Sequence, residues 1–386
     1  MRRIREWILV ASVLAFAVML CGCGGQGGTK GGTAGTAGKP PGGAINWAIA
    51  YVRDSTLYVG DFTGANSMNL TSPKAHTYVR ECTWSPDGKK IAFLQAAAVN
   101  RKADDLYIIN ADKTGLTLVR SFFDASDPFP QPALAWSAEG NKLVYPVDPV
   151  YFASHGGVND IAVLDMSRPS QTANLLGLRD LELGQMSGRL IQLSDAALSP
   201  DTNPGNQTYE GVLAFAAWRQ VWNDNATPPD WETVGYVIAM VKVVTDAAGS
   251  LGLASDPGLL SMPGVPAHPA FSRDAAHSEL AFEDGNGRLM AVGIDLTGPA
   301  FSGTPTDWTP QVSGGHAWHP TWVPRADADG KLWIAFHAYV LAQSGYTWLD
   351  VFRACVGDTA PVNITNTPNN SDAGPDWNPA WDPSKP

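Results

Sequence analysis

The stretch Thr83–Phe93, TWSPDGKKIAF, joins a tryptophan to a short apolar segment through a turn. Pro86 presets the backbone angle of a turn, Asp87 can accept hydrogen bonds from the amides that follow it, and Gly88 can adopt a positive φ. The apolar residues Ile91-Ala92-Phe93 have the composition and alternation of a strand. The stretch therefore predicts an aromatic residue, a tight turn and a strand, in that order.

The apolar triplet of this stretch recurs along the chain at intervals of 42 to 70 residues. The six copies are Ile49-Ala50-Tyr51, Ile91-Ala92-Phe93, Leu143-Val144-Tyr145, Leu213-Ala214-Phe215, Leu280-Ala281-Phe282 and Ile334-Ala335-Phe336. An aromatic or apolar anchor residue and a turn precede five of them, with anchors Trp84, Trp136, Leu198, Phe271 and Trp322. Each interval is long enough for a unit of four strands, so the chain is a repeat protein.

The first and last parts of the repeat region are incomplete in complementary ways. The first triplet has no anchor before it, whereas Trp377–Pro383, WNPAWDP, offers the anchor Trp381 with no triplet after it. A ring closed by pairing the two termini accounts for both gaps, while an open solenoid needs capping repeats. Residues 45–386 are thus predicted to form an all-β, six-bladed β-propeller of four-stranded antiparallel blades. The carboxyl-terminal segment supplies the innermost strand of the blade built from residues 45–76.

This repeat resembles that of the TolB-like propellers, in which an aromatic residue, Ser-Pro-Asp-Gly and Ile-Ala-Phe follow one another. The likeness is clear in residues 84–93, weaker in the other copies, and covers residues 45–386. TolB itself carries an amino-terminal α/β domain, whereas only a glycine-rich segment precedes the repeats in this sequence. The Gly-x-Ser-x-Gly motif of related hydrolases does not occur. The resemblance therefore implies a fold and not the role of any family member.

The first residues have the order of an export signal. A positive start with Arg2, Arg3 and Arg5 leads into the apolar run Ile8–Leu20, which is short for a membrane span. The run ends in Leu20-Cys21-Gly22-Cys23, which resembles a bacterial lipobox; an ordinary signal peptide is the alternative. We expect residues 1–22 to be a lipoprotein signal peptide, Cys23 to be lipidated, and residues 23–44 to tether the propeller to the membrane. This predicts an extracytoplasmic protein of the cell envelope, on the outer membrane where there is one.

Composition narrows the classes of partner. The net charge is −11, and no basic run provides the patch that nucleic-acid phosphates require, so nucleic-acid binding is excluded. With 39 glycines, 29 prolines and 44% hydrophobic residues, the 386-residue chain suits many short strands and a large core. We expect a monomer, with Cys82 and Cys355 as buried thiols that are not paired.

In a propeller, the loops that enter the innermost strands share one face with the loops that join second and third strands. Polar residues stand three positions before most of the predicted anchors, at the mouth of the central channel. The six positions are Glu81, Ala133, Asp195, His268, His319 and Asn378. They can bind a polar ligand or simply line a wet channel.

Histidines and carboxylates are also common metal ligands. Oligogalacturonate lyases are TolB-like propellers with histidines in comparable His-Pro phrases, although their blade count differs. That resemblance implies a divalent metal at His268, His316 and His319. The expectation from the residues alone is that there is no cofactor, and no residue can be assigned as a catalytic base.

Two loops add aromatic residues to the same face. Residues 219–233, RQVWNDNATPPDWET, carry Trp222 and Trp231, and residues 146–159 carry Tyr151 and His155. Aromatic rings beside Asn and Asp suit sugar stacking or a protein-binding hot spot, unless the loops fold back onto their own blades. We therefore predict a propeller that binds a protein or an envelope polysaccharide on this face and is not an enzyme. The alternatives are a metal-dependent polysaccharide lyase or hydrolase and a structural module of an envelope complex.

Overall fold

The computed structural model describes residues 46–72, 77–96, 104–122, 133–137, 139–147, 160–171, 173–176, 178, 189–200, 210–228, 230–245, 251–272, 278–312, 315–323, 331–341, 347–355, 360–368 and 370–381. Throughout these residues the regular elements are β-strands, which confirms the all-β prediction. The same residues contain no helix that is long and apolar enough to cross a membrane. The predicted signal peptide, Cys23 and the tether lie outside the described residues, as do Tyr151 and His155.

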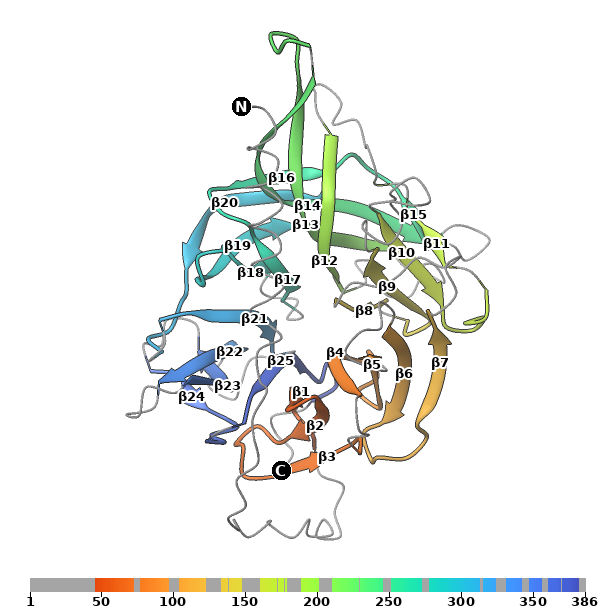
Figure 1. The fold of residues 1–386 in the computed structure, drawn as a ribbon, viewed down its shortest axis with the longest axis vertical. Coiled ribbons are helices and arrows are strands. Elements are labelled where there is room, and N and C mark those ends of the chain that lie inside the picture. Colours follow the sequence, from red (N-terminus) through yellow and green to blue (C-terminus); the bar gives the residue numbers. More distant parts are fainter. Residues whose placement is uncertain are drawn as a thin grey trace. The chain divides into compact units, whose positions relative to one another are not determined.

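The strands form six antiparallel sheets in a ring, which confirms the six-bladed β-propeller (Figure 1). From the channel outward, blade 1 consists of β25 (Asp372–Trp377), β1 (Ile49–Arg53), β2 (Thr56–Gly60) and β3 (Ser67–Asn69). Blade 2 consists of β4 (Tyr78–Trp84), β5 (Lys90–Ala96), β6 (Asp104–Asn110) and β7 (Thr117–Ser121). Blade 3 consists of β8 (Ala135–Trp136), β9 (Lys142–Pro146), β10 (Ile161–Asp165) and β11 (Asn174–Leu175). Blade 4 consists of β12 (Arg189–Leu198), β13 (Glu210–Asn223), β14 (Asp230–Thr245) and β15 (Leu251–Leu253). Blade 5 consists of β17 (Ala267–Phe271), β18 (Glu279–Glu283), β19 (Leu289–Asp295) and β20 (Ala300–Asp307). Blade 6 consists of β21 (Ala317–Trp322), β22 (Trp333–Leu341), β23 (Thr347–Cys355) and β24 (Val362–Asn363). Blade 4 has one further strand, β16 (Gly258–Met262), which pairs with β14.

The repeated triplets lie in the second strands of the blades and are buried between neighbouring sheets. Ala92 of blade 2, for example, belongs to the same apolar cluster as Leu143 and Tyr145 of blade 3. The tryptophan anchors also hydrogen-bond across the gap between blades. The indole Nε1–H of Trp136 donates to the Thr83 carbonyl at 3.3 Å, and that of Trp322 to the Ala270 carbonyl at 3.0 Å. The aromatic position of the repeat therefore joins each of these blades to the one before it.

The ring closes between the two ends of the repeat region, as predicted. β25 pairs with β1, so that Trp377 lies opposite Ile49 and Asp372 opposite Arg53. The predicted anchor was wrong, however: β25 ends at Trp377, which is 1% exposed, and Trp381 lies beyond the strand and stacks on Phe62.

Asn378 is displaced from the predicted ring for the same reason. Its backbone N–H donates to the Ala48 carbonyl, as the Ser85 N–H donates to Lys90 in blade 2. Its side chain accepts from the Ala380 N–H and donates to the Trp47 carbonyl. Asn378 is thus the first turn residue after the innermost strand, at the opposite end of that strand from the channel mouth.

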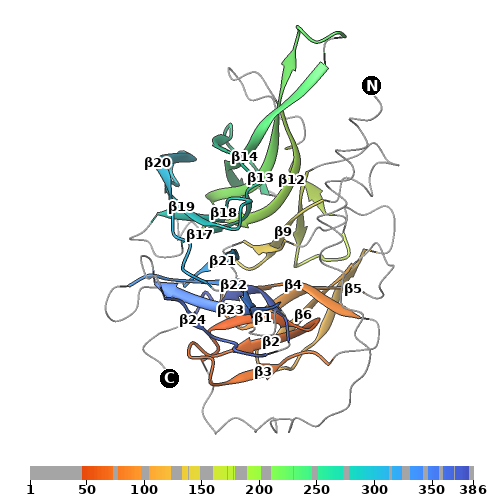
Figure 2. The same cartoon turned by 60° about the vertical axis from the view of Figure 1, so that its left-hand side comes forward.

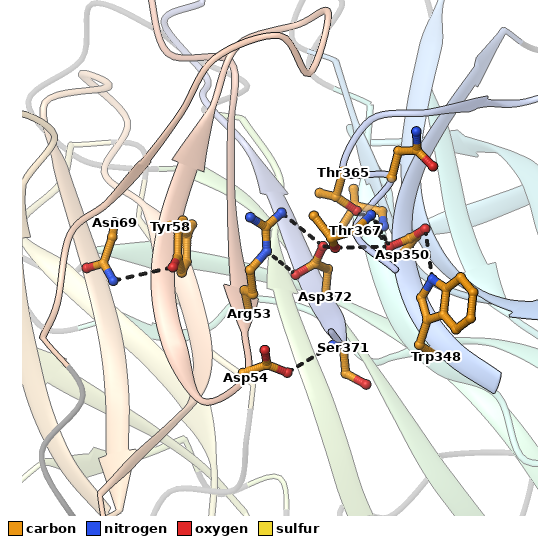
Figure 3. Close-up of polar contacts among 12 residues, drawn as sticks. Arg53, Asp54, Tyr58, Asn69, Trp348, Asp350, Thr365, Thr367, Ser371 and Asp372 are labelled. Carbon is orange, nitrogen blue, oxygen red and sulfur yellow. Dashed lines mark hydrogen bonds and ion pairs between the residues drawn. The ribbon is translucent and has the colours of Figure 1, made fainter. Parts of the chain in front are cut away.

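A buried polar network fixes the junction between blades 6 and 1 (Figure 3). The Arg53 guanidinium pairs with the Asp372 carboxylate, with Nε 2.7 Å from Oδ1. The Thr367 hydroxyl donates to Asp372 at 2.6 Å and lies 3.3 Å from Asp350. Asp350 also accepts from the Asn363 amide at 2.7 Å. Because Asp350 and Asp372 are at most 1% exposed, these bonds compensate the desolvation of both carboxylates.

Blade 4 carries a hairpin much longer than those of the other blades. β13 has 14 residues and β14 has 16, and the two pair through Asn223 and Asp230. The hairpin projects beyond the other blades in both ribbon views (Figures 1 and 2). Strand order places its tip on the face where innermost strands begin, and we call this the ring face. The loop of residues 219–233 is therefore the end of an extended hairpin.

Cys82 and Cys355 are buried, as expected, and no disulfide bond joins them.

Candidate functional site

The channel mouth is built from one position in each of five innermost strands and from one position just before the sixth, β8. These positions, the channel ring, are Glu81, Ala133, Asp195, His268, His319 and Gly374. Four of them have left-handed backbone angles: φ is 51° at Asp195, 48° at His268, 55° at His319 and 56° at Gly374. In each of these four strands the pairing register shifts at this point, with one more residue on the innermost strand than on its partner. The shift is a β-bulge, which turns a side chain out of the regular alternation of the strand.

Left-handed backbone is ordinary for glycine but costs about 1 kcal/mol or more for a residue with a Cβ atom. Asp195, His268 and His319 all adopt it. The repeated bulge therefore holds three polar side chains at the same position of their strands, each on a backbone with strained angles. Such strain is concentrated at functional sites in proteins.

The channel ring borders a cavity of about 100 Å³ that all six innermost strands line. Glu81, Asp195, His268 and His319 all line it, so the structure brings together four of the five polar residues predicted at the channel mouth. Pro375 and Asp376 of β25 complete the wall. Asp376 bridges neighbouring blades, because its carboxylate accepts from the Trp84 N–H at 2.7 Å and lies 3.3 Å from the Thr321 hydroxyl.

His268 lies between two carboxylates. Its Nδ1 is 3.2 Å from Glu283 Oε2, and its Nε2 is 3.5 Å from Asp195 Oδ1. Burial alone would lower the pKa of His268, but the surrounding carboxylates, Asp195 first and Glu283 next, raise it to about 9. His268 is therefore an imidazolium at neutral pH, fixed by ion pairs on both ring nitrogens.

His319 and His337 continue the cluster on blade 6. The His319 ring stacks on His268 with centroids 4.2 Å apart, and its Nε2 is 3.5 Å from Glu81 Oε1. Burial, and then the charges of His319 and His268, hold the pKa of His337 well below its usual range. The Gly374 N–H donates to His337 Nδ1 at 3.2 Å, so the proton of this neutral ring is on Nε2.

The three predicted metal ligands do not form a metal site. His268 and His319 are stacked nearly parallel, at 23°, so their nitrogen lone pairs do not converge on one point. His316 does not line the cavity; it stacks on Trp318 and its Nδ1 is 3.1 Å from the Asn286 carbonyl. In the described part of the chain, no group of three or more His, Cys, Asp or Glu side chains has metal-binding geometry. These residues therefore do not fit a divalent metal.

Sequence reasoning missed Glu283, His337 and Gly374. Glu283 and His337 directly follow the triplets Leu280-Ala281-Phe282 and Ile334-Ala335-Phe336, where the other four blades have Val52, Leu94, Pro146 and Ala216. A polar residue at this position of a second strand was the available signal. Gly374 was missed because two successive segments, Gly374-Pro-Asp-Trp and Asn378-Pro-Ala-Trp, both place a tryptophan three residues after the first residue. The prediction took the second segment, and the structure places the first in the innermost strand.

The tryptophans of the long hairpin lie opposite each other near its tip. Trp222 is 48% exposed, and its Nε1–H donates to Asp224 at 2.6 Å. Its ring meets Trp231 edge-on, at 74° and 5.5 Å. The Arg189 guanidinium lies 4.3 Å from the centre of the Trp231 ring. The two indoles thus form a fixed, projecting apolar pair at the hairpin tip and not one flat stacking surface.

Several solved structures align with most of this chain at low sequence identity. A nidogen/laminin complex contains a chain that is 10% identical, with 87% of this chain and 99% of that chain aligned and a TM-score of 0.47. A putative TolB from Agrobacterium tumefaciens is 13% identical over 87% and 99% of the two chains, with a TM-score of 0.41. An oligogalacturonate lyase from Vibrio parahaemolyticus is 8% identical over 80% and 70%, with a TM-score of 0.38. Comparison with protein families and with curated sequences gives no match. The propeller fold of this chain therefore rests on its own sheet topology, and the likeness to these structures carries no function.

Proposed function

We propose that this protein is a lipid-anchored, extracytoplasmic propeller that binds a protein partner on its ring face. The observation that carries the proposal is the exposed Trp222 at the end of the long hairpin. A large ring that is held in solvent by a hydrogen bond and by Trp231 is typical of a binding hot spot, because most tryptophan surface is buried in a lone protein.

The chemistry of the tip favours a protein over a sugar. The edge-on indoles offer no flat surface for a pyranose, and Arg189 lies against Trp231. Asp224 accepts the hydrogen bond of the Trp222 indole, and Asp230 and Glu232 flank Trp231 along β14, so the hairpin tip carries three acidic groups. The partner therefore presents an apolar pocket with a basic rim, to which opposite charges steer the hairpin.

Lipidation at Cys23 and the tether of residues 23–44 would keep this face near other envelope proteins. The metal-dependent lyase has no such support, because the stacked histidines do not form a metal site. A permanent structural contact would also use the hairpin, and it differs from the proposal in being insensitive to dilution.

The test begins with photo-crosslinking in intact cells. A photoreactive residue replaces Trp222 in the full chain, and a matched control carries it at Leu118, which is 50% exposed on the outermost strand of blade 2. We expect a protein that crosslinks from position 222 and not from position 118. Binding of that purified protein to the full chain should weaken at least about thirtyfold in Trp222→Ala and remain unchanged in Leu118→Ala. Equal binding by the wild type and Trp222→Ala, or no crosslink specific to position 222, would overturn the proposal.

A further inference from the structure

A second feature of the ring face does not involve the hairpin. Six aromatic rings, the aromatic strip, contact one another from the channel to the rim of blade 6: His268, His319, His337, Trp318, Tyr339 and His316. The ring centroids of His268 and His319 are 4.2 Å apart, and those of His319 and His337 are 5.9 Å apart. The Trp318 centroid is 5.9 Å from that of His337, 4.9 Å from that of Tyr339 and 5.5 Å from that of His316. The inner end lines the cavity, whereas Tyr339 is 39% exposed and His316 is exposed.

The backbone of blade 6 places the outer part of the strip. Trp318 lies opposite His337 in the pairing of β21 with β22. Because alternate residues of a strand point to the same side, Tyr339 projects from the same side of β22 as His337. Trp318 meets the Tyr339 ring edge-on, at 87°.

A glycine makes room for the outermost ring. Gly287 has φ of +77°, and a Cβ atom there would lie 2.0 Å from His316 Nδ1. His316 is parallel to Trp318 within 8° and lies 3.1 Å from the Asn286 carbonyl. The exposed end of the strip is therefore held in place by its neighbours without any partner.

Hydrogen-bonding groups accompany the rings. Glu81, Asp195 and Glu283 provide carboxylate oxygens at the inner end, and His337 carries its proton on Nε2. Aromatic faces that take C–H surface, next to fixed donors and acceptors that take hydroxyl groups, are the combination that sugar rings require. A purely apolar docking surface would lack the inner polar groups.

The charge of the strip selects among sugars. Three carboxylates surround the imidazolium of His268, whose pKa they raise to about 9, and among the described residues no Arg or Lys lines the cavity. This excess of negative charge repels uronic acids and does not affect uncharged sugars. We propose that the aromatic strip binds an uncharged oligosaccharide, with one sugar ring stacked on His316, which lies parallel to Trp318, and with Tyr339 at the edge of that sugar. A sugar further along the same oligosaccharide directs hydroxyl groups into the cavity.

The test measures sugar binding by the full chain, purified in a detergent without a sugar headgroup. An array of uncharged, N-acetylated and uronate-containing oligosaccharides identifies a ligand, and titration calorimetry gives its affinity. We expect at least one uncharged oligosaccharide to bind and hexagalacturonate not to bind. Tyr339→Ala and Glu81→Gln should each weaken binding about tenfold. Trp222→Ala should leave sugar binding unchanged, so the result is independent of the proposed protein partner.

Each other result counts against the strip. No binding of any uncharged oligosaccharide, or binding only of uronates, would overturn the proposal. So would unchanged affinity in Tyr339→Ala and Glu81→Gln, since the sugar would then lie elsewhere. If Tyr339→Ala weakens the binding of the crosslinked protein partner and no sugar binds, the strip is part of the protein interface. Because Tyr339 is exposed, its variant should melt at the same temperature as the wild type, which separates lost binding from lost fold.

Discussion

At the scale of single residues, His268 should make the stability of the protein depend on pH. Its pKa is about 9 in the folded protein and about 6.5 in an unfolded chain. A raised pKa stabilises the fold fully below pH 6.5, and this stabilisation is lost as the pH rises through about 9. The loss is at most about 3 kcal/mol, and solvent reduces it because the side chain is 28% exposed. Urea unfolding of the wild type and His268→Gln, at several pH values from about 6 to 10, measures this difference.

The matched control is His316→Gln, which removes an exposed imidazole that has no carboxylate partner in the described contacts. We expect this variant to keep the slope of the wild type, whereas His268→Gln flattens it. Identical slopes in the wild type and His268→Gln would show that the carboxylates do not hold the imidazolium. His337, whose pKa is lowered by burial, contributes a separate loss of stability as the pH falls below about 6.5.

How far single residues could be predicted depended on which strand they occupy. Asp195, His268 and His319 were found because they keep a fixed spacing to an anchor within one strand. Glu283 and His337 join them through pairing between strands, as in the pair Ala267 and Glu283, which a search along one strand does not follow.

At the scale of elements, the pairing of β25 with β1 depends on Arg53 and Asp372. Asp372 is fully buried and the Arg53 side chain is 13% exposed, so removing one charge leaves the other unpaired away from water. Such losses cost about 3 to 5 kcal/mol, and we expect Asp372→Asn to lower the free energy of unfolding by about 3 kcal/mol. Chemical denaturation of the full chain measures this change.

An exposed pair provides the comparison for this prediction. The Lys89 ammonium lies 3.8 Å from Asp87, and the two side chains are 79% and 55% exposed. Lys89→Gln should leave the unfolding midpoint unchanged, because solvent screens the pair. If Asp372→Asn behaves like Lys89→Gln, the polar network of blades 6 and 1 does not stabilise ring closure.

Elements differed in how visible they were in the sequence. The triplets marked all six second strands because these strands are buried on both sides and keep an apolar composition. The length of β13 and β14 was not visible, since residues such as Gln220, Asn223 and Glu232 alternate with apolar residues only weakly. Pairing across the hairpin, with Trp222 opposite Trp231, extends these strands through a polar segment.

At the scale of the whole molecule, blade number and closure followed from counting repeats, whereas the chemistry of the channel did not. Closure was predictable because the first blade lacks an innermost strand and the last segment of the chain has no blade of its own. Pairing the two in a ring supplies the missing strand. The cavity needed the structure, because its six walls come from strands that are far apart in the chain. The offset between Trp377 and Trp381 shows the limit of counting: two overlapping phrases fit the repeat, both tryptophans are buried, and only the pairing of β25 with β1 identifies Trp377 as the anchor.

Closure in space, and not the order of the chain, should determine whether the propeller folds. Truncation after Ser371 removes β25, whose Trp377 is buried with Ile49 and Val323 between blades 1 and 6, so we expect the cooperative unfolding transition to be lost. A circular permutant should restore it. In this permutant residues 370–381 come first and a short Gly/Ser linker joins them to residue 46.

The linker has little distance to span, because the Asn378 side chain already donates to the Trp47 carbonyl at 2.9 Å. We expect the permutant to unfold cooperatively, with a free energy within about 1 kcal/mol of that of residues 46–381 in their natural order, since only a short loop changes. Scanning calorimetry of the three chains measures the outcome. A permutant that remains uncooperative would mean that β25 must join the ring last, after the other five innermost strands have formed.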